Sequence, residues 1–177
     1  MDNPQSNFSF RMMALWFRAR DFFSPPTKIL SEIDLSPDSS ILDYGCGPGS
    51  FSIAAAQIVK ASGKVYALDI HPLAIEQVKK AAVKNGLQNT ITTILSNCTT
   101  GLDNETIDVV LFYDVFHALS EQFSVLQELH RILKDRGRLS FSDHHLTEDT
   151  ILHEISKDGL FQLVKKGNKT YTFAKQI

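Results

Sequence analysis

Residues 41–49 read ILDYGCGPG, an apolar strand that ends in an acid and is followed by glycines at alternate positions. The acid is Asp43 and the glycines are Gly45, Gly47 and Gly49. Glycine has no Cβ and tolerates positive φ, so a ligand can approach the backbone of such a turn closely. The small residues from Ser50 onward predict a helix, whose N-terminal end carries a partial positive charge. The stretch therefore predicts a cradle for a nucleoside-like ligand at the end of the first strand of an open α/β sheet.

The glycine spacing distinguishes two classes of nucleotide-binding loop. Dinucleotide-binding loops follow G-x-G-x-x-G or G-x-G-x-x-A, but Ser50 occupies the third position of that pattern here. The D-x-G-x-G-x-G form of residues 43–49 instead resembles motif I of the class I S-adenosylmethionine-dependent methyltransferases. The chain looks most like the methyltransferase type 11 or ubiquinone-menaquinone methyltransferase-like group, and the resemblance covers nearly everything from Ile29 to Ile177.

Strand and helix patterns alternate along the rest of the chain. The expected helices cover residues 50–61, 72–85, 121–133 (ending near Gly137) and 148–156, and the expected strands cover residues 64–70, 90–95, 107–112 and 138–142. Two alternating stretches, 160–166 and 170–175, then flank a Gly-Asn turn and predict a β-hairpin. The alternation predicts a doubly wound, Rossmann-like α/β fold. With the hairpin it resembles the seven-stranded methyltransferase sheet, mostly parallel with an antiparallel C-terminal strand.

Two parts of the chain are expected. Residues 29–177 form a single S-adenosylmethionine-binding domain, and residues 1–28 form an aromatic-rich helical segment that Pro25-Pro26 interrupts. Three interpretations of that segment remain open. It is a lid over the cofactor that brings Trp16 to the substrate pocket, a helix that packs its aromatic side chains on the sheet, or a basic amphipathic helix on a membrane surface.

The composition excludes several classes of protein. The chain has 177 residues, 43% of them hydrophobic and 21% charged, with a formal net charge of −2. Scattered Lys and Arg give no broad nucleic-acid footprint, and Cys46 and Cys98 provide neither a disulfide framework nor a metal-ligand set. Charged residues interrupt every long apolar run, so no transmembrane segment or signal peptide is expected. These features predict a reduced, cytoplasmic protein, and a homodimer remains open.

The resemblance implies S-adenosyl-L-methionine as cofactor and S-adenosyl-L-homocysteine as product. Asp43 would help to hold the amino-acid end of the cofactor. Asp69 ends the second strand, where a carboxylate accepts both ribose hydroxyls, although an ordinary helix-capping role is the alternative. Asn97 stands where many related enzymes carry an acid that accepts the adenine amino group. The expected cofactor-binding residues are Asp43, Gly45, Cys46, Gly47, Gly49, Asp69, Ile70, Asn97, Cys98 and Tyr113.

The loop after the fourth strand carries the candidate catalytic residues Tyr113, Asp114 and His117. Methyl transfer from a sulfonium is an in-line displacement, so the protein must align the nucleophile, exclude water and place any base. His117 is the best general-base candidate because the pKa of an imidazole lies near neutrality. The alternative is that Asp114 and His117 cap the next helix.

The sequence Asp143-His144-His145 ends the fifth strand, on the edge of the sheet where ligands bind. We expect His144 and His145 to line the substrate pocket. Neighbouring residues of an extended chain point to opposite sides, which argues against a shared chelate, so no metal is expected.

These features predict methyl transfer from S-adenosylmethionine to a small-molecule acceptor by in-line displacement, with no nucleic-acid partner. Two alternatives remain: a dinucleotide-dependent oxidoreductase of the NAD type with an atypical glycine loop, and a non-catalytic module that retains the cofactor pocket.

Overall fold

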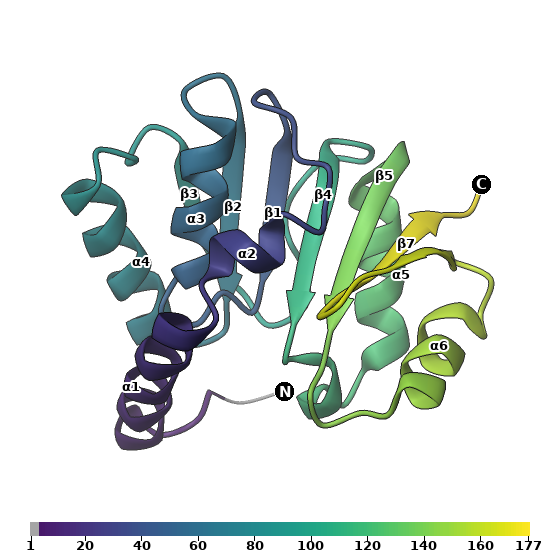
Figure 1. The fold of residues 1–177 in the computed structure, drawn as a ribbon, viewed down its shortest axis with the longest axis horizontal. Helices are drawn as coiled ribbons and strands as arrows, with labels where there is room; N and C mark the ends of the chain where they lie inside the picture. The colour runs from purple at the N-terminus through teal and green to yellow at the C-terminus, as the bar shows by residue number, and fades with distance from the viewer. Residues whose placement is uncertain (1–3) are drawn as a thin grey trace.

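A single mixed sheet organises residues 4–177, the part of the chain that the computed structural model describes. In these residues seven strands lie in the order β3-β2-β1-β4-β5-β7-β6 (Figure 1). Their bounds are β1 Ser40–Tyr44, β2 Lys64–Asp69, β3 Ile91–Leu95, β4 Ile107–Tyr113, β5 Leu133–Ser142, β6 Phe161–Lys166 and β7 Tyr171–Lys175. The pairs among β1 to β5 are parallel, and β7 runs antiparallel to both β5 and β6. The predicted fold class, including the antiparallel C-terminal hairpin, is confirmed.

The helices cover both faces of the sheet, as a doubly wound fold requires. Their bounds are α1 Asn7–Phe23, α2 Pro26–Leu30, α3 Ser50–Val59, α4 Pro72–Lys84, α5 Gln122–Ile132 and α6 Glu148–Ser156, with the short 3₁₀ helix η1 at Phe116–Ala118. Strand side chains alternate between two apolar layers. Ile41 and Val109 pack with the helices α2 to α4, whereas the adjacent Leu42 and Val110 pack with α5 and α6. Among the described residues, no helix combines the length and apolar character needed to cross a bilayer.

One predicted boundary is wrong. The helix that was expected to end near Gly137 ends at Ile132, and β5 begins at Leu133 rather than at Arg138. Leu133 is fully buried, takes extended backbone angles and pairs with Ile107. The register then shifts before the next pair, Val109 with Arg138, so the charged residues between form an irregular segment inside the strand. Their polar sequence resembles the end of a helix.

The carboxyl ends of the parallel strands meet along one edge of the sheet, the lower edge in Figure 1. Helix α1 lies beside this edge, at the lower left of the figure. It packs on the first turn of α4 through Phe10 and Ala14, which contact Ala74. Other large apolar side chains of α1 are exposed: Phe8, Met12, Leu15, Trp16, Phe22 and Phe23. The sheet edge and α1 together enclose the site.

Candidate functional site

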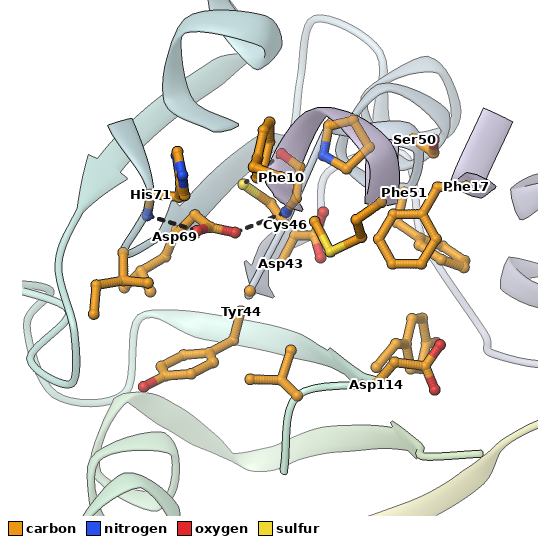
Figure 2. A pocket seen from close by; sticks show the side chains of 18 of the residues that line it. Phe10, Phe17, Asp43, Tyr44, Cys46, Ser50, Phe51, Asp69, His71 and Asp114 are labelled. Atoms are coloured by element: carbon orange, nitrogen blue, oxygen red, sulfur yellow. Dashed lines mark hydrogen bonds between the residues drawn. The ribbon is translucent and has the colours of Figure 1, made fainter. Parts of the chain in front are cut away.

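A cavity lies between α1 and the carboxyl ends of β1, β2 and β4 (Figure 2). The space among its lining residues is about 930 Å³ when the open solvent at its mouth is included. The lining residues are Gln5, Phe10, Met13, Phe17, Arg20, Asp43, Tyr44, Gly45, Cys46, Gly47, Pro48, Ser50, Phe51, Leu68, Asp69, Ile70, His71, Ser96, Asn97, Tyr113, Asp114, Val115 and Leu119. Four segments that follow strands therefore converge with one helix on a single space.

The three glycines of the first loop have different roles. All three have positive φ, between 51° and 91°. A Cβ on Gly45 would lie 2.3 Å from Cγ2 of Val115, and a Cβ on Gly49 would lie 2.7 Å from Cγ2 of Val78. These two glycines thus permit close packing of the loop after β4 and of α4. A Cβ on Gly47 would meet only the Phe17 ring, at 3.6 Å, so Gly47 is the glycine that leaves the floor of the cavity open.

Two carboxylates in the cavity carry perturbed acidities. Burial and, to a smaller extent, the nearby Asp69 together raise the pKa of Asp43 to about 7, although the hydroxyl of Ser52 donates to Asp43 and opposes this rise. Burial also raises the pKa of Asp69. The N–H groups of Gly47 and His71 donate to its two oxygens at 2.8 and 2.7 Å and oppose that rise. Each carboxylate oxygen has two lone pairs, so Asp69 can accept further hydrogen bonds from a ligand.

Helix α1 forms the roof of the cavity. Phe10, Met13, Phe17 and Arg20 line it, and their spacing of three or four residues places them on one helix face. Two contacts on His71 hold the start of the segment: its ring stacks on Phe10 with centroids 4.4 Å apart, and its Nε2 lies 3.0 Å from the carbonyl oxygen of Gln5. At the other end, Nη1 of Arg20 lies 3.4 Å from Oδ2 of Asp114.

The cavity brings together most of the residues proposed from the sequence. The expected residues that line it are Asp43, Gly45, Cys46, Gly47, Asp69, Ile70, Asn97, Tyr113 and Asp114. The hydroxyl of Tyr113 bonds to Oγ of Ser140 at 2.7 Å, so it is engaged inside the sheet. Burial raises the pKa of the Cys46 thiol well above its usual value.

Six expected residues lie outside the lining of this cavity: Trp16, Gly49, Cys98, His117, His144 and His145. Gly49 caps α3 where α4 packs. Cys98 lines a separate surface hollow beside Glu128. Trp16 is half exposed and lies one position from the Phe17 that faces the cavity. The three histidines lie in the two loops that follow β4 and β5.

Those two loops exchange hydrogen bonds in a crossed arrangement. Asp143 ends β5 and accepts from Nδ1 of His117, which follows β4, at 2.9 Å. Asp114 ends β4 and accepts from Nδ1 of His144, which follows β5, at 2.8 Å. Each carboxylate also accepts the backbone N–H of the histidine it holds, at 3.0 and 3.1 Å. Each loop is thereby fixed by the acid of the other.

The expectation that His144 and His145 point to opposite sides is wrong. Their ring centroids are 3.9 Å apart, and the His145 ring lies 4.0 Å from that of His117. The chain turns after Asp143, where the N–H of Leu146 donates to the Asp143 carbonyl, so the alternation of an extended strand does not apply. Within residues 4–177, no group of three or more His, Cys, Asp or Glu side chains is arranged to hold a metal ion.

Several lining residues were not proposed from the sequence. His71 accepts the N–H of Leu73 through Nδ1 and so caps α4, while its Nε2 faces the Gln5 carbonyl. The sequence predicted Trp16 of α1 at the substrate pocket, whereas Phe17 is the residue that lines the cavity. The spacing of Phe10, Met13 and Phe17 was the available signal. That spacing does not single out one face of the helix, because large apolar residues occur all around it.

The sheet order, the glycine loop and the buried carboxylates together define an α/β protein of the class I methyltransferase type. Residues 35–176 match the family described as methyltransferase domain, and the chain belongs to that family. S-adenosylmethionine is the methyl donor for this family, so the NAD-dependent alternative is set aside.

Relatives with known names act on different acceptors. The chain is 32% identical over 124 residues to the aklanonic acid methyltransferase DauC of Streptomyces sp. (strain C5), which covers 69% of this chain and 56% of DauC. It is 30% identical over 112 residues to the tRNA (adenine(58)-N(1))-methyltransferase catalytic subunit TRM61 of Yarrowia lipolytica, covering 63% of this chain and 28% of TRM61. The chain thus spans about half or less of the length of these relatives.

A solved structure supports the fold. The S-adenosylmethionine-dependent methyltransferase from Aquifex aeolicus superimposes with a TM-score of 0.74 at 23% identity, covering 85% of this chain and 88% of the other. At this identity the likeness establishes the architecture and leaves the acceptor open.

Proposed function

We propose that this methyltransferase acts on a small-molecule acceptor, which reaches the methyl group at the mouth of the cavity between α1 and the loops after β4 and β5. The observation that carries the proposal is the roof: one face of α1 lies over the cavity, and Arg20 of that face contacts Asp114 of the loop after β4. A roofed site favours an acceptor that is small enough to enter it. The small-molecule acceptor named for DauC agrees with this proposal.

The residues of the cavity fit S-adenosylmethionine. The open space over Gly47 admits a ligand close to the backbone. Asp69 has lone pairs for a ribose diol, and Asp43 offers a buried carboxylate for an ammonium group. Ile70 supplies an apolar surface for a base, and the Asn97 side chain offers an amide at the same end of the cavity. When bound, the cofactor supplies an activated methyl group on a sulfonium.

We further propose that residues 4–28 act as the lid of the domain formed by residues 29–177; residues 1–3 of the predicted segment 1–28 lie outside the described residues. The support lies in the contacts of both ends of α1 with the site, at His71 and at Asp114. In this role the segment excludes water from the sulfonium and provides one wall for the acceptor. The exposed side chains of Phe8, Phe22 and Phe23 on α1 do not line the cavity.

Calorimetric titration with S-adenosylmethionine, S-adenosylhomocysteine and NAD tests the cofactor residues. We expect micromolar binding of the first two and none of NAD. Asp69→Ala is expected to lose most of the affinity, whereas Asp135→Ala, a change at an exposed carboxylate of β5, is expected to retain it. Equal affinity of these two variants would contradict the role of Asp69.

A transfer assay then tests the acceptor class. Formation of S-adenosylhomocysteine is measured with a panel of hydroxylated, carboxylated and amino small molecules and, separately, with bulk tRNA. Turnover on the small-molecule panel supports the proposal. Turnover on tRNA alone would overturn it, and cofactor binding without turnover on either would favour a non-catalytic module.

A further inference from the structure

The loops after β4 and β5 present a row of rings beside the cavity mouth. His117, His145 and His144 follow one another with tilted rings whose centroids are 4.0 and 3.9 Å apart, and the Trp16 ring of α1 follows His144 at 6.3 Å. His144 is the member tied directly to the cavity, because Asp114, which lines the cavity, accepts its Nδ1. Its side chain is 55% exposed, so the ring is accessible from solvent.

We propose that His144, held by Asp114, removes the proton from a hydroxyl of a planar, phenol-like acceptor that packs against the Trp16 and His144 rings. The proposal rests on the proposed methyltransferase function and names the acceptor class of that same site. It assigns the general base to His144 in place of His117, the candidate suggested by the sequence.

The hydrogen bonds determine which imidazole nitrogen is available. Asp114 accepts at Nδ1 of His144, so the proton of the neutral ring lies on Nδ1 and the lone pair lies on Nε2. Asp114 is itself fixed, since it also accepts from the backbone N–H of His144 and from Arg20. Asp114 is therefore a positioning residue, and His144 is the group that would touch the acceptor.

The imidazole and phenol groups that line the cavity already have hydrogen-bond partners within the protein. Both ring nitrogens of His71 have partners, the hydroxyl of Tyr113 is tied to Ser140, and Tyr44 donates to the carbonyl oxygen of Asn97. His117 is held by the fully buried Asp143 on the β5 side of its loop and does not line the cavity. His144 is thus the imidazole whose Nδ1 is held by a residue of the cavity lining, which leaves Nε2 as its basic nitrogen.

The chemistry of the site selects the acceptor class. A carboxylate or an ionised thiol is already nucleophilic, whereas a hydroxyl must lose its proton as the new bond forms. The acceptor oxygen gains the methyl carbon, the carbon–sulfur bond breaks with its electron pair left on sulfur, and the hydroxyl proton passes to Nε2 of His144. The exposed imidazolium then releases that proton to water. Aromatic walls favour a planar acceptor through stacking.

The experiment measures transfer to a series of substituted phenols that differ in acidity, with wild type, His144→Gln and, as a matched control on the exposed face of α6, His153→Gln. We expect wild type and the control to methylate the phenols. His144→Gln should lower kcat on weakly acidic phenols by about 100-fold or more, with little loss on nitrophenols that are already ionised. Its affinity for S-adenosylmethionine should be unchanged.

The pH dependence of kcat distinguishes a general base from a side chain that only packs against the acceptor. The groups that face His144 are Asp114, Arg20, His145 and Trp16, with Asp21 paired to Arg20 and the His117–Asp143 pair beyond His145. For weakly acidic phenols, kcat of the wild type should fall at low pH, and this fall should be absent in His144→Gln. Asp114→Asn should reduce the Nδ1–H tautomer of His144 seen by ¹⁵N NMR, and Asn tolerates the left-handed backbone that Asp114 adopts (φ 54°).

Three results would overturn the inference. They are an equal loss of kcat on ionised and unionised phenols in His144→Gln, unchanged turnover in that variant, and turnover of carboxylic or amino acceptors by a wild type that methylates no phenol. If cofactor binding itself is absent, the proposed function fails. If cofactor binds but no probe is methylated, the hydroxyl acceptor class is rejected while the cofactor site stands.

Discussion

Asp143 and His117 come from different loops, yet the Asp143 carboxylate accepts both the backbone N–H and the ring Nδ1 of His117, at 3.0 and 2.9 Å. The same carboxylate accepts the N–H of His145 at 3.1 Å, and its side chain has no exposed surface. One buried acid therefore fixes the turn after β5 and the start of η1 together. The positions of His117 and His145 depend on it.

Asp143→Asn is expected to destabilise the protein by about 2 kcal/mol, because a buried donor would then face a donor. An amide has only one accepting atom, and all the groups around Asp143 donate. Urea unfolding of this variant beside Asp135→Asn, an exposed position, measures the difference. Equal unfolding free energies for the two variants would show that the crossed pairs do not hold the loops.

Gly45→Ala and Gly86→Ala separate close packing from backbone strain. Both glycines have positive φ, 77° and 69°, but only the Cβ at position 45 would collide, at 2.3 Å from Val115. Gly86→Ala should cost about 1 kcal/mol from the left-handed backbone alone. Gly45→Ala should cost 1–3 kcal/mol more, roughly the penalty of overpacking. Thermal unfolding of both variants checks the order, and a smaller loss at position 45 would contradict it.

The sequence predicted the sheet because its signals are local. Apolar runs of strand length, helix stops at glycine and the hairpin turn lie within a few residues of the elements they specify. The start of β5 was missed because the pairing of Leu133 with Ile107 joins residues that are distant in the chain, and the register shift that follows is a property of two strands.

The residues that line the cavity around the glycine loop were predictable, whereas the arrangement of the loops after β4 and β5 was not. Asp43 lies near the end of β1, Gly47 lies in the loop that follows, and Asp69 ends β2, and the carboxyl ends of these parallel strands must meet at one edge. The Asp114–His144 bond instead depends on how each chain turns after leaving the sheet. The face of α1 over the cavity was likewise hidden, because Trp16 and Phe17 are both apolar and only packing on α4 orients the helix.

The affinity for S-adenosylmethionine is expected to rise with pH up to about 7 because of Asp43. Burial raises the pKa of this carboxyl to about 7, so in the free protein it is largely protonated below that pH. An ammonium ligand prefers the ionised form, so binding in that range must release the proton. The same raised pKa makes Asp43 cost folding stability as the pH rises from 3.8, its usual value, to about 7.

Calorimetry at pH 6 in buffers of different ionisation enthalpy measures the proton released on binding. Asp43→Asn, which preserves shape and keeps an acceptor for Ser52, should bind more weakly and release less proton. If Asp43→Asn shows the same proton release as the wild type, the proton comes from another group.

Glu128 is expected to stabilise the protein above pH 4.5 and to lose that contribution in acid. Its carboxylate accepts from Arg131 and from both the N–H and the hydroxyl of Thr100, and the Arg131 hydrogen bond is the largest cause that lowers its pKa to about 2. A lowered pKa means that the unfolded chain takes up the proton first, so stability falls as the pH drops from 4.5 towards 2. The free-energy difference between wild type and Glu128→Gln should be about 1 kcal/mol at pH 7. It should shrink in acid, and a difference independent of pH would refute the prediction.

Helix α1 offers a matched pair of phenylalanines for testing the lid. Phe10 is 1% exposed and stacks on His71 inside the cavity, whereas Phe8 is 75% exposed. Phe10→Ala should detach the start of the helix from α4. We expect this change to weaken S-adenosylmethionine binding by about tenfold, which corresponds to about 1.4 kcal/mol of binding free energy. The same change should speed proteolytic cleavage near the N-terminus, and bound cofactor should slow that cleavage in the wild type. Phe8→Ala should alter neither quantity. Because both residues lie on one helix, a similar effect of the two substitutions would indicate a general loss of helicity and would argue against a lid that closes on the cofactor.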